Sequence, residues 1–297
     1  MKQNYIFILL LIILIGAGIW YFSDKEGGET ELPYLINKIE YICKDDKTIE
    51  ASYFEGELIP VEPGEMLTPA GQVKVVLSDG RELELPQTIS ASGVRYANDD
   101  ESIIFWSKGN GAFLLENDEE TYSGCIVLPT DPEGLPNVYL DNDTGFVVRY
   151  PADYRVDAAY KYTALGPEKE IKGVKFIVSP DFTEGTNLSS ADTGVSIETI
   201  SEIENCNAGL FLGENAEIQE KEENGNIYSF ASSAEAAVGN RYEEQVWAIP
   251  TIHSCIGVRY FIHYMAIENY PEEEVREFDK DVLIEQFDKI RYSLITQ

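Results

Sequence analysis

The stretch Val73-Lys-Val-Val-Leu-Ser-Asp-Gly-Arg-Glu-Leu-Glu-Leu85 contains two short runs of largely alternating apolar and polar residues around Asp79-Gly80. Alternation with a period of two is typical of a half-buried β-strand, and Asp-Gly between such runs is a strong signal for a tight hairpin. A second hairpin is predicted around Lys108-Gly-Asn-Gly111, between Ile103–Trp106 and Ala112–Leu115. This part of the chain should therefore be antiparallel β-structure.

Two earlier segments, Tyr41–Cys43 and Ile49–Phe54, supply further strands. Short antiparallel strands joined by tight turns predict a small all-β barrel or sandwich. The segment Leu128–Pro136 then contains three prolines and one glycine, a composition that excludes a helix or a central strand and is typical of a linker. We therefore predict a first domain at 33–129, a linker at 130–135 and a second domain at 136–297.

The second domain combines both periodicities. Strands are predicted at Gly145–Tyr150, Val174–Val178 and Val258–Tyr264. Near the end, apolar residues recur at helical spacing behind Asp279, a candidate N-cap: Val282, Leu283, Phe287, Ile290 and Leu294. An amphipathic helix packed on a sheet predicts an α+β or α/β domain.

The N-terminus carries an apolar run from Tyr5 to Phe22 that only Gly16 and Gly18 interrupt. Eighteen residues is at the lower end for a transmembrane helix. Lys2 precedes the run and acidic residues follow it, which predicts that the N-terminus stays inside. We expect a membrane anchor or signal segment at 1–25, a stem at 26–32, and both domains on the extracytoplasmic (periplasmic or cell-surface) side of the cytoplasmic membrane. Whether the segment is cleaved stays open.

Four cysteines are consistent with an oxidising compartment: Cys43, Cys125, Cys206 and Cys255. Four cysteines allow three pairings. Two lie on each side of the proline-rich linker, which favours Cys43–Cys125 and Cys206–Cys255. Their spacing matches no zinc pattern. We expect no metal site and no cofactor.

The charge balance restricts the class of partner. The chain has 53 acidic and 22 basic residues, a formal net charge of −31. Phosphate backbones would repel such a chain, so nucleic acid is excluded as a partner, whereas a basic protein would be attracted. Residues 33–129 alone carry 7 basic and 18 acidic residues, a net charge of −11. Acidity could also simply keep an exported protein soluble.

Two turn-forming segments of the first domain are candidates for a functional site: Ser90–Tyr96 and Phe105–Ala112. Their glycines permit turns that lift a neighbouring residue off the sheet, which would present the Ser92 hydroxyl and the Lys108 ammonium on adjacent loops. Hairpin tips also carry Ser, Lys and Gly simply because they face water. The acidic run Asn98–Glu101 is expected beside these loops, where it could steer a basic enzyme or compete for Lys108.

The first domain resembles the MliC/PliC inhibitors of C-type lysozyme over about 41–125. The matching motifs are Tyr41-Ile-Cys43, the strands around Asp79-Gly80, Ser92-Gly-Val-Arg-Tyr96, Phe105-Trp-Ser-Lys-Gly109 and Tyr122-Ser-Gly-Cys125. The resemblance implies an eight-stranded antiparallel barrel closed by Cys43–Cys125, and an inhibitor that is not an enzyme.

The same resemblance implies roles for single residues. Ser92 and Lys108 would enter the lysozyme cleft and engage its catalytic carboxylates, while Gly93, Tyr96 and Gly109 would hold the two loops in shape. A C-type lysozyme works with a protonated glutamic acid and an ionised aspartate, so a hydroxyl and an ammonium fit this pair.

The second domain resembles the PsbP-like group of α/β sandwich domains over about 145–295, which implies an α+β sandwich. The matching motifs are Gly145–Pro151, Gly239–Glu244, Cys255, Val258–His263 and the C-terminal helix. This group has no single activity, so the partner of the second domain is unknown. One alternative function is an envelope-associated docking module that acts through this domain.

A second alternative is a cell-wall hydrolase that uses Glu243 and Glu244 within a polar cluster on one sheet face, together with Arg241, Arg259 and His263. A hydrogen-bonded network that only fixes strand order would have the same composition. His263 by itself is expected to be a buried, hydrogen-bonded residue, and Asp141–Gly145 is expected to be a turn rather than a calcium loop.

Overall fold

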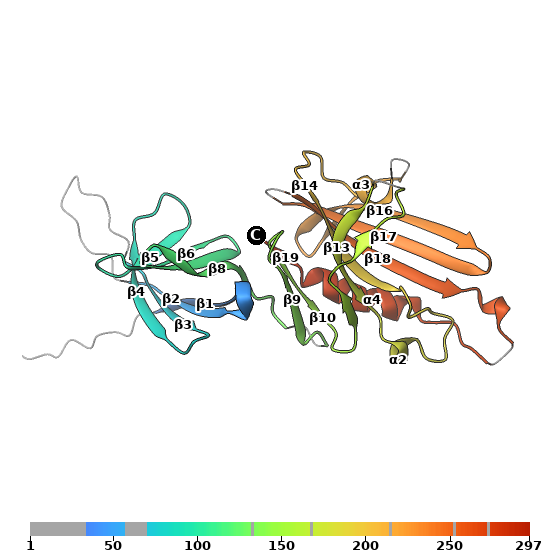
Figure 1. Ribbon diagram of the computed structural model, residues 1–297, viewed down its shortest axis with the longest axis horizontal. Helices are drawn as coiled ribbons and strands as arrows, with labels where there is room; N and C mark the ends of the chain where they lie inside the picture. Colours follow the sequence, from blue (N-terminus) through green and yellow to red (C-terminus); the bar gives the residue numbers. More distant parts are fainter. Residues whose placement is uncertain are drawn as a thin grey trace, which may run out of the picture. The chain divides into compact units, whose positions relative to one another are not determined.

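The computed structural model describes residues 34–56, 70–131, 134–166, 169–213, 216–251, 254–271 and 274–297. The anchor predicted at 1–25 and the stem at 26–32 lie outside these residues. Within the described ranges, no helix has both the length and the apolar character needed to cross a bilayer. Figure 1 shows the strands of the first domain and the strands and helices of the second domain.

The first domain is a closed barrel in which eight strands follow one another in sequence order. The strands are β1 (Leu35–Ile42), β2 (Thr48–Phe54), β3 (Gln72–Leu77), β4 (Glu82–Thr88), β5 (Val94–Ala97), β6 (Ile103–Lys108), β7 (Gly111–Glu116) and β8 (Glu119–Val127). A short 3-10 turn, η1 (Lys44–Asp46), joins β1 to β2. The barrel that the family resemblance implied is therefore confirmed, and the sandwich is not formed.

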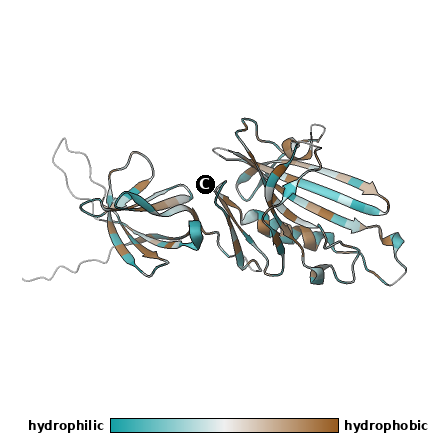
Figure 2. Ribbon diagram, in the orientation of Figure 1, coloured by the Kyte–Doolittle hydropathy of each residue, from teal (hydrophilic) through white to brown (hydrophobic). Residues whose placement is uncertain are grey.

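Alternation of side chains builds the barrel core, as the sequence predicted, and Figure 2 shows this alternation along the strands. In β3, Val73, Val75 and Leu77 point inward and are at most 3% exposed. The turn that follows is the predicted one, because Gly80 has a φ of +89° and the amide of Arg81 donates to Oδ1 of Asp79 over 3.0 Å. Local sequence thus determines both the strand pattern and the hairpin.

Both predicted disulfides are present. Cys43–Cys125 links the end of β1 to β8 and spans 82 residues, and Cys206–Cys255 spans 49 residues in the second domain. Both cysteines of the first pair are fully buried. The pairing predicted from the position of the linker is therefore confirmed.

The second domain contains two antiparallel sheets. The small sheet has the order β19-β10-β9, and the large sheet has the order β11-β13-β14-β18-β17-β16-β15, with β12 paired to β13. The strands are β9 (Asn137–Asp141), β10 (Phe146–Tyr150), β11 (Arg155–Asp157), β12 (Lys161–Tyr162), β13 (Ile171–Ile177), β14 (Gly194–Ser201), β15 (Gln219–Glu223), β16 (Asn226–Ala237), β17 (Asn240–Pro250), β18 (Ser254–Met265) and β19 (Ile295–Thr296).

The predicted C-terminal helix is α4 (Lys280–Tyr292), and Asp279 caps it by accepting a hydrogen bond from the amide of Val282 over 3.1 Å. Its apolar face buries Leu283, Phe287 and Ile290 in the core of this domain. Three short helical segments complete the domain: α2 (Pro180–Thr183), α3 (Gly209–Leu212) and η2 (Ile267–Asn269). The predicted packing of a helix on a sheet is confirmed.

Removing the barrel disulfide should strongly destabilise the barrel. A cross-link across a loop of this length restricts the unfolded chain, so Cys43→Ala/Cys125→Ala should lower the free energy of unfolding by about 4 kcal/mol. Hydrogen–deuterium exchange in increasing urea measures this loss peptide by peptide.

The pair Cys206→Ala/Cys255→Ala is the matched control, because its loss should appear in peptides of the second domain. Barrel peptides that exchange at the wild-type rate in the first variant would contradict the prediction.

Candidate functional site

Strand register brings the two candidate loops together. The segment 89–93 connects β4 to β5, and the two-residue turn after Lys108 connects β6 to β7. Val94 pairs with Ser107 across β5 and β6, so the residues just beyond this pair are neighbours at one end of the ladder. The structure therefore places the Ser92 segment beside Lys108.

Gly93 makes the direct contact between the two segments. Its φ is +69°, and a Cβ at this position would lie 2.5 Å from the carbonyl oxygen of Ser107 and 3.0 Å from Cβ of Lys108. Only glycine combines this left-handed backbone with so close an approach. The predicted loop-shaping role of Gly93 thus has a geometric basis in the packing of the 89–93 segment against β6.

Two hydrogen bonds hold Ser92 in place, and both use its carbonyl oxygen. The indole Nε1–H of Trp106 donates to it over 2.9 Å, and the hydroxyl of Ser90 donates over 2.7 Å. The side chain of Ser92 itself is exposed. The loop is thus fixed through its backbone, which leaves the hydroxyl free to face outward. Sequence analysis did not assign this role to Trp106.

Lys108 is exposed at the end of β6, and Gly109, with a φ of +56°, turns the chain away from it. A Cβ on Gly109 would contact nothing within 4 Å, so only its backbone conformation requires glycine. In the described part of the barrel, ion pairs are formed by Lys38, Lys74, Arg81 and Arg95, and none by Lys108.

Tyr96 lies beneath the loops and not on the surface. It is 5% exposed and stacks on Phe105 at 6.4 Å between ring centroids. Burial raises the pKa of Tyr96 to about 12, so the phenol stays neutral at physiological pH. Its position agrees with the expected role in holding the loops and leaves little of the side chain for a partner to touch.

A buried polar chain that sequence analysis missed supports the end of β6. The hydroxyls of Tyr41 and Tyr53 lie 2.9 Å apart, and the Tyr53 hydroxyl donates to Oγ of Ser107 over 3.3 Å. Burial raises the pKa of both tyrosines. Ser107 directly precedes Lys108, so the chain ties the lysine-bearing strand to the core.

The expectation that the acidic run Asn98–Glu101 lies beside these loops was wrong. The run connects β5 to β6 at the opposite end of their ladder from Ser92 and Lys108. Glu101 pairs with Arg95 at 2.9 Å, which lowers the pKa of its carboxyl, and Asp100 accepts a hydrogen bond from the amide of Ser102. These carboxylates have other partners and do not compete for Lys108.

The polar cluster predicted on one face of the second domain is divided between two faces. Glu243 and Glu244 are adjacent in β17, and adjacent strand residues point to opposite faces. Glu243 pairs with Lys280 of α4, whereas Glu244 pairs with Arg259 and accepts a hydrogen bond from the Tyr162 hydroxyl. The two carboxylates cannot flank one scissile bond, so they offer no paired acid and base.

Arg259 and His263 of this cluster both have close polar partners. Arg259 is fully buried and binds Glu198 through two hydrogen bonds of 2.7 and 2.8 Å. His263 is partly buried between Asp192, 2.7 Å from Nδ1, and Asn240, 2.9 Å from Nε2. The expectation of a hydrogen-bonded His263 is therefore confirmed, and both ring nitrogens are occupied.

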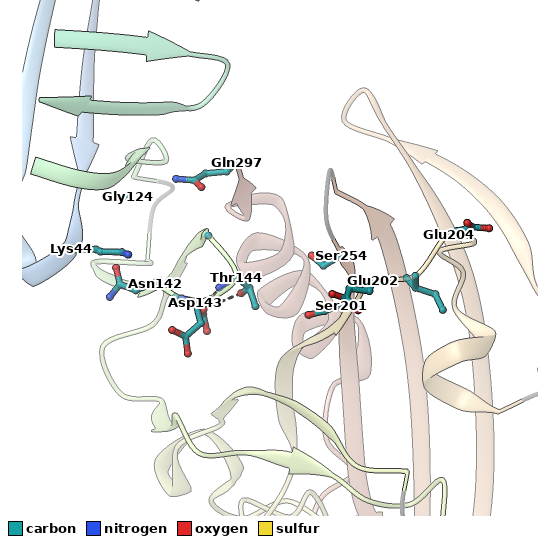
Figure 3. A pocket seen from close by; sticks show the side chains of 13 residues that line it. Lys44, Gly124, Asn142, Asp143, Thr144, Ser201, Glu202, Glu204, Ser254 and Gln297 are labelled. Atoms are coloured by element: carbon teal, nitrogen blue, oxygen red, sulfur yellow. Dashed lines mark hydrogen bonds between the residues drawn. The ribbon is translucent and has the colours of Figure 1, made fainter. Parts of the chain in front are cut away.

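Asp141–Gly145 is the predicted turn. One carboxylate oxygen of Asp141 accepts hydrogen bonds from the amides of Asp143 and Thr144 and from the Thr144 hydroxyl, at 2.8–2.9 Å. This carboxylate is used to close the turn between β9 and β10. Figure 3 labels Asp143 and Thr144 in this turn. Across the described ranges, no group of three or more His, Cys, Asp or Glu side chains is placed to hold a metal ion.

Comparison with known proteins shows what the first domain is similar to. Residues 41–122 match the family model described as membrane-bound lysozyme-inhibitor of c-type lysozyme (MliC). A membrane-bound lysozyme inhibitor of C-type lysozyme from Yersinia enterocolitica is 39% identical over 64 residues, which are 22% of this chain and 52% of the relative. The match thus spans about half the length of that relative. The MliC resemblance of the first domain is confirmed over 41–122.

Two solved structures resemble larger parts of the chain. A crystal structure of a protein from Bacteroides thetaiotaomicron is 11% identical and covers 56% of this chain and 49% of its own, with a TM-score of 0.31. The solution structure of cyanobacterial PsbP from Synechocystis sp. PCC 6803 is 13% identical and covers 57% and 96%, with the same TM-score. The second of these structures is a PsbP protein, the group that the second domain was expected to resemble.

Gly93 and Gly109 should differ in their tolerance of alanine. Gly109→Ala should cost about 1–2 kcal/mol of stability, because it strains only a left-handed backbone. Gly93→Ala should cost more, because the added methyl also collides with the backbone of Ser107. Urea unfolding of the two variants gives both values. Equal losses would show that the 89–93 segment does not pack against β6 as described.

Proposed function

We propose that this protein inhibits C-type lysozyme by inserting Ser92 and Lys108 into the catalytic cleft of the enzyme. The observation that carries the proposal is the contact at Gly93, which sets an exposed serine beside an exposed lysine in a segment that matches the MliC family. Inhibition requires no chemistry by the inhibitor, because occupation of the cleft excludes the substrate.

The chemistry of the two side chains matches the catalytic pair of the enzyme. The ammonium group of Lys108 would pair with the ionised aspartate, and the hydroxyl of Ser92 would hydrogen-bond the protonated glutamic acid. Lys108 forms none of the ion pairs in the described part of the barrel, so it gives up no carboxylate partner on binding. The hydrogen bonds to the Ser92 carbonyl oxygen fix the loop before binding, which reduces the entropy lost in the complex.

The remaining site residues act indirectly in this proposal. Gly93 and Gly109 give the loops their backbone conformations, and Tyr96 supports them from the core.

The net charge of −11 over 33–129 would attract a basic enzyme and speed association. The proposed domain limits are those predicted above, with the inhibitory function in 33–129 and the partner of 136–297 unassigned.

We further propose that residues 1–25 anchor the protein in the cytoplasmic membrane and that the folded domains lie on its extracytoplasmic side. The apolar run Tyr5–Phe22 is long enough to span a bilayer, and the two disulfides fit an oxidising compartment. The name of the Yersinia relative describes that protein as membrane-bound.

Lys108→Ala should weaken inhibition of a C-type lysozyme by about 2–5 kcal/mol, because it leaves a buried carboxylate of the enzyme unpaired. Lys108→Glu should inhibit the enzyme more weakly than Lys108→Ala. The measurement is an inhibition titration of lysozyme activity with the full chain, purified in mild detergent, at low and high salt. Inhibition by the wild-type chain should weaken at high salt, because the attraction between exposed charges of the two proteins is screened.

Lys74→Ala is the matched control, since it removes the same charge from β3, where Lys74 pairs with Glu82. It should change inhibition little. Inhibition that is equal for wild type, Lys108→Ala and Lys74→Ala would remove the site assignment.

Deletion of residues 1–25 should release the protein from the membrane fraction. Cells that express the full chain should retain it with membranes after high-salt washing, whereas a chain that carries a cleavable export signal in place of 1–25 should be soluble. If cells that express the full chain yield soluble protein that lacks its first residues, the segment has been cleaved.

A further inference from the structure

An exposed apolar side chain sits on the same loop as Ser92. Ile89 is 62% exposed, although isoleucine is among the residue types most often buried. The rest of the segment is Ser90-Ala-Ser-Gly93, so Ile89 is its only large side chain. Within the described barrel, the other exposed large hydrophobic residues are Tyr34, Leu35 and Ile36, at the start of β1.

The base of the loop holds Ile89 in place. Ile89 directly follows Thr88, which pairs with Arg95 across β4 and β5. The guanidinium of Arg95 donates to the Thr88 hydroxyl over 2.9 Å and pairs with Glu101 at the same distance. The backbone around Ile89 is thus fixed on one side by the β4–β5 ladder and on the other by the hydrogen bonds to Ser92. Little chain entropy remains to be lost when the side chain is buried by a partner.

Ile89 is close enough to Lys108 to share one interface with it. β4 and β6 are both neighbours of β5, and adjacent strands lie about 4.8 Å apart, so the two positions are separated laterally by about 10 Å. A protein interface of ordinary size buries about 800 Å² on each partner, which is a patch of roughly 16 Å radius. A lysozyme that receives Lys108 in its cleft would therefore also cover Ile89.

We propose that Ile89 is an apolar anchor that packs on the rim of the lysozyme cleft and lengthens the lifetime of the complex. This inference rests on the proposed inhibition of lysozyme. Exposed charges act mainly on the association rate, whereas contacts that are buried in the complex, apolar ones included, slow dissociation. The partner surface is accordingly an apolar patch that borders a cleft with an ionised carboxylate.

The test compares binding kinetics of the full chain, in mild detergent, with an immobilised C-type lysozyme at 0.05 M and 1 M salt. Ile89→Ala should raise the dissociation rate about tenfold, which corresponds to about 1.4 kcal/mol, and change the association rate less than about twofold. The increase in dissociation rate should be the same at both salt concentrations, because salt does not screen an apolar contact. Ile89→Val should give a smaller increase. Lys108→Ala should also dissociate faster, because it leaves a carboxylate of the enzyme unpaired.

Two isoleucines of nearly equal exposure are matched controls. Ile36 is 61% exposed on β1 and Ile227 is 58% exposed on β16 of the second domain. Ile36→Ala and Ile227→Ala should both dissociate at the wild-type rate.

The outcomes separate the two proposals. If Lys108→Ala weakens binding but Ile89→Ala dissociates like the controls, the role of Ile89 is overturned and the proposed function stands. An effect of Ile89→Ala that disappears at 1 M salt would also overturn it, since the contact would not be apolar. A wild-type chain that does not bind any C-type lysozyme overturns both.

Discussion

Closure of the barrel depends on a very short ladder. β1 and β8 pair through only two residue pairs, Tyr41 with Val127 and Ile42 with Ile126, whereas β1 and β2 share seven. Two pairs contribute few hydrogen bonds, and an open seam would leave strand edges unpaired. The disulfide Cys43–Cys125 lies directly beside this seam and joins the same two strands covalently. The disulfide therefore helps to hold β1 against β8, where only two residue pairs form the ladder.

The seam is connected to the candidate site through the core. Tyr41 belongs to the closing pair, and its hydroxyl contacts that of Tyr53, which in turn donates to Ser107. Ser107 is the residue whose backbone Gly93 approaches most closely. A barrel that opened at β1 and β8 would thus lose the support under the strand that carries Lys108. Stability of the fold and geometry of the loops are linked by these few polar contacts inside an otherwise apolar core.

Features that depend on local sequence could be predicted, whereas contacts that depend on which strands pair, and in which register, could not. Alternation and Asp79-Gly80 predicted the β3–β4 hairpin, and Asp279 predicted the start of α4. The position of the acidic run 98–101 was predicted from its nearness in sequence to Ser90–Tyr96. Strand β5 separates the two, so they lie at opposite ends of the β5–β6 ladder. The division of Glu243 and Glu244 between two faces was readable from strand alternation alone. The contact of Tyr53 with Ser107 joins distant strands, so only the barrel register could show it.

The distribution of charge resolves an apparent conflict in the proposed function. An acidic surface attracts a basic enzyme at long range but would repel the carboxylates inside its cleft. In the described barrel, the run Asp99–Glu101 lies at least five residues along β6 from Lys108, or roughly 17 Å at 3.3 Å per residue. This is about two Debye lengths at physiological salt, so these carboxylates barely weaken the field of the lysine at contact. Steering and docking can therefore use opposite charges on one small domain, because hairpin reversal separates them by more than the screening distance.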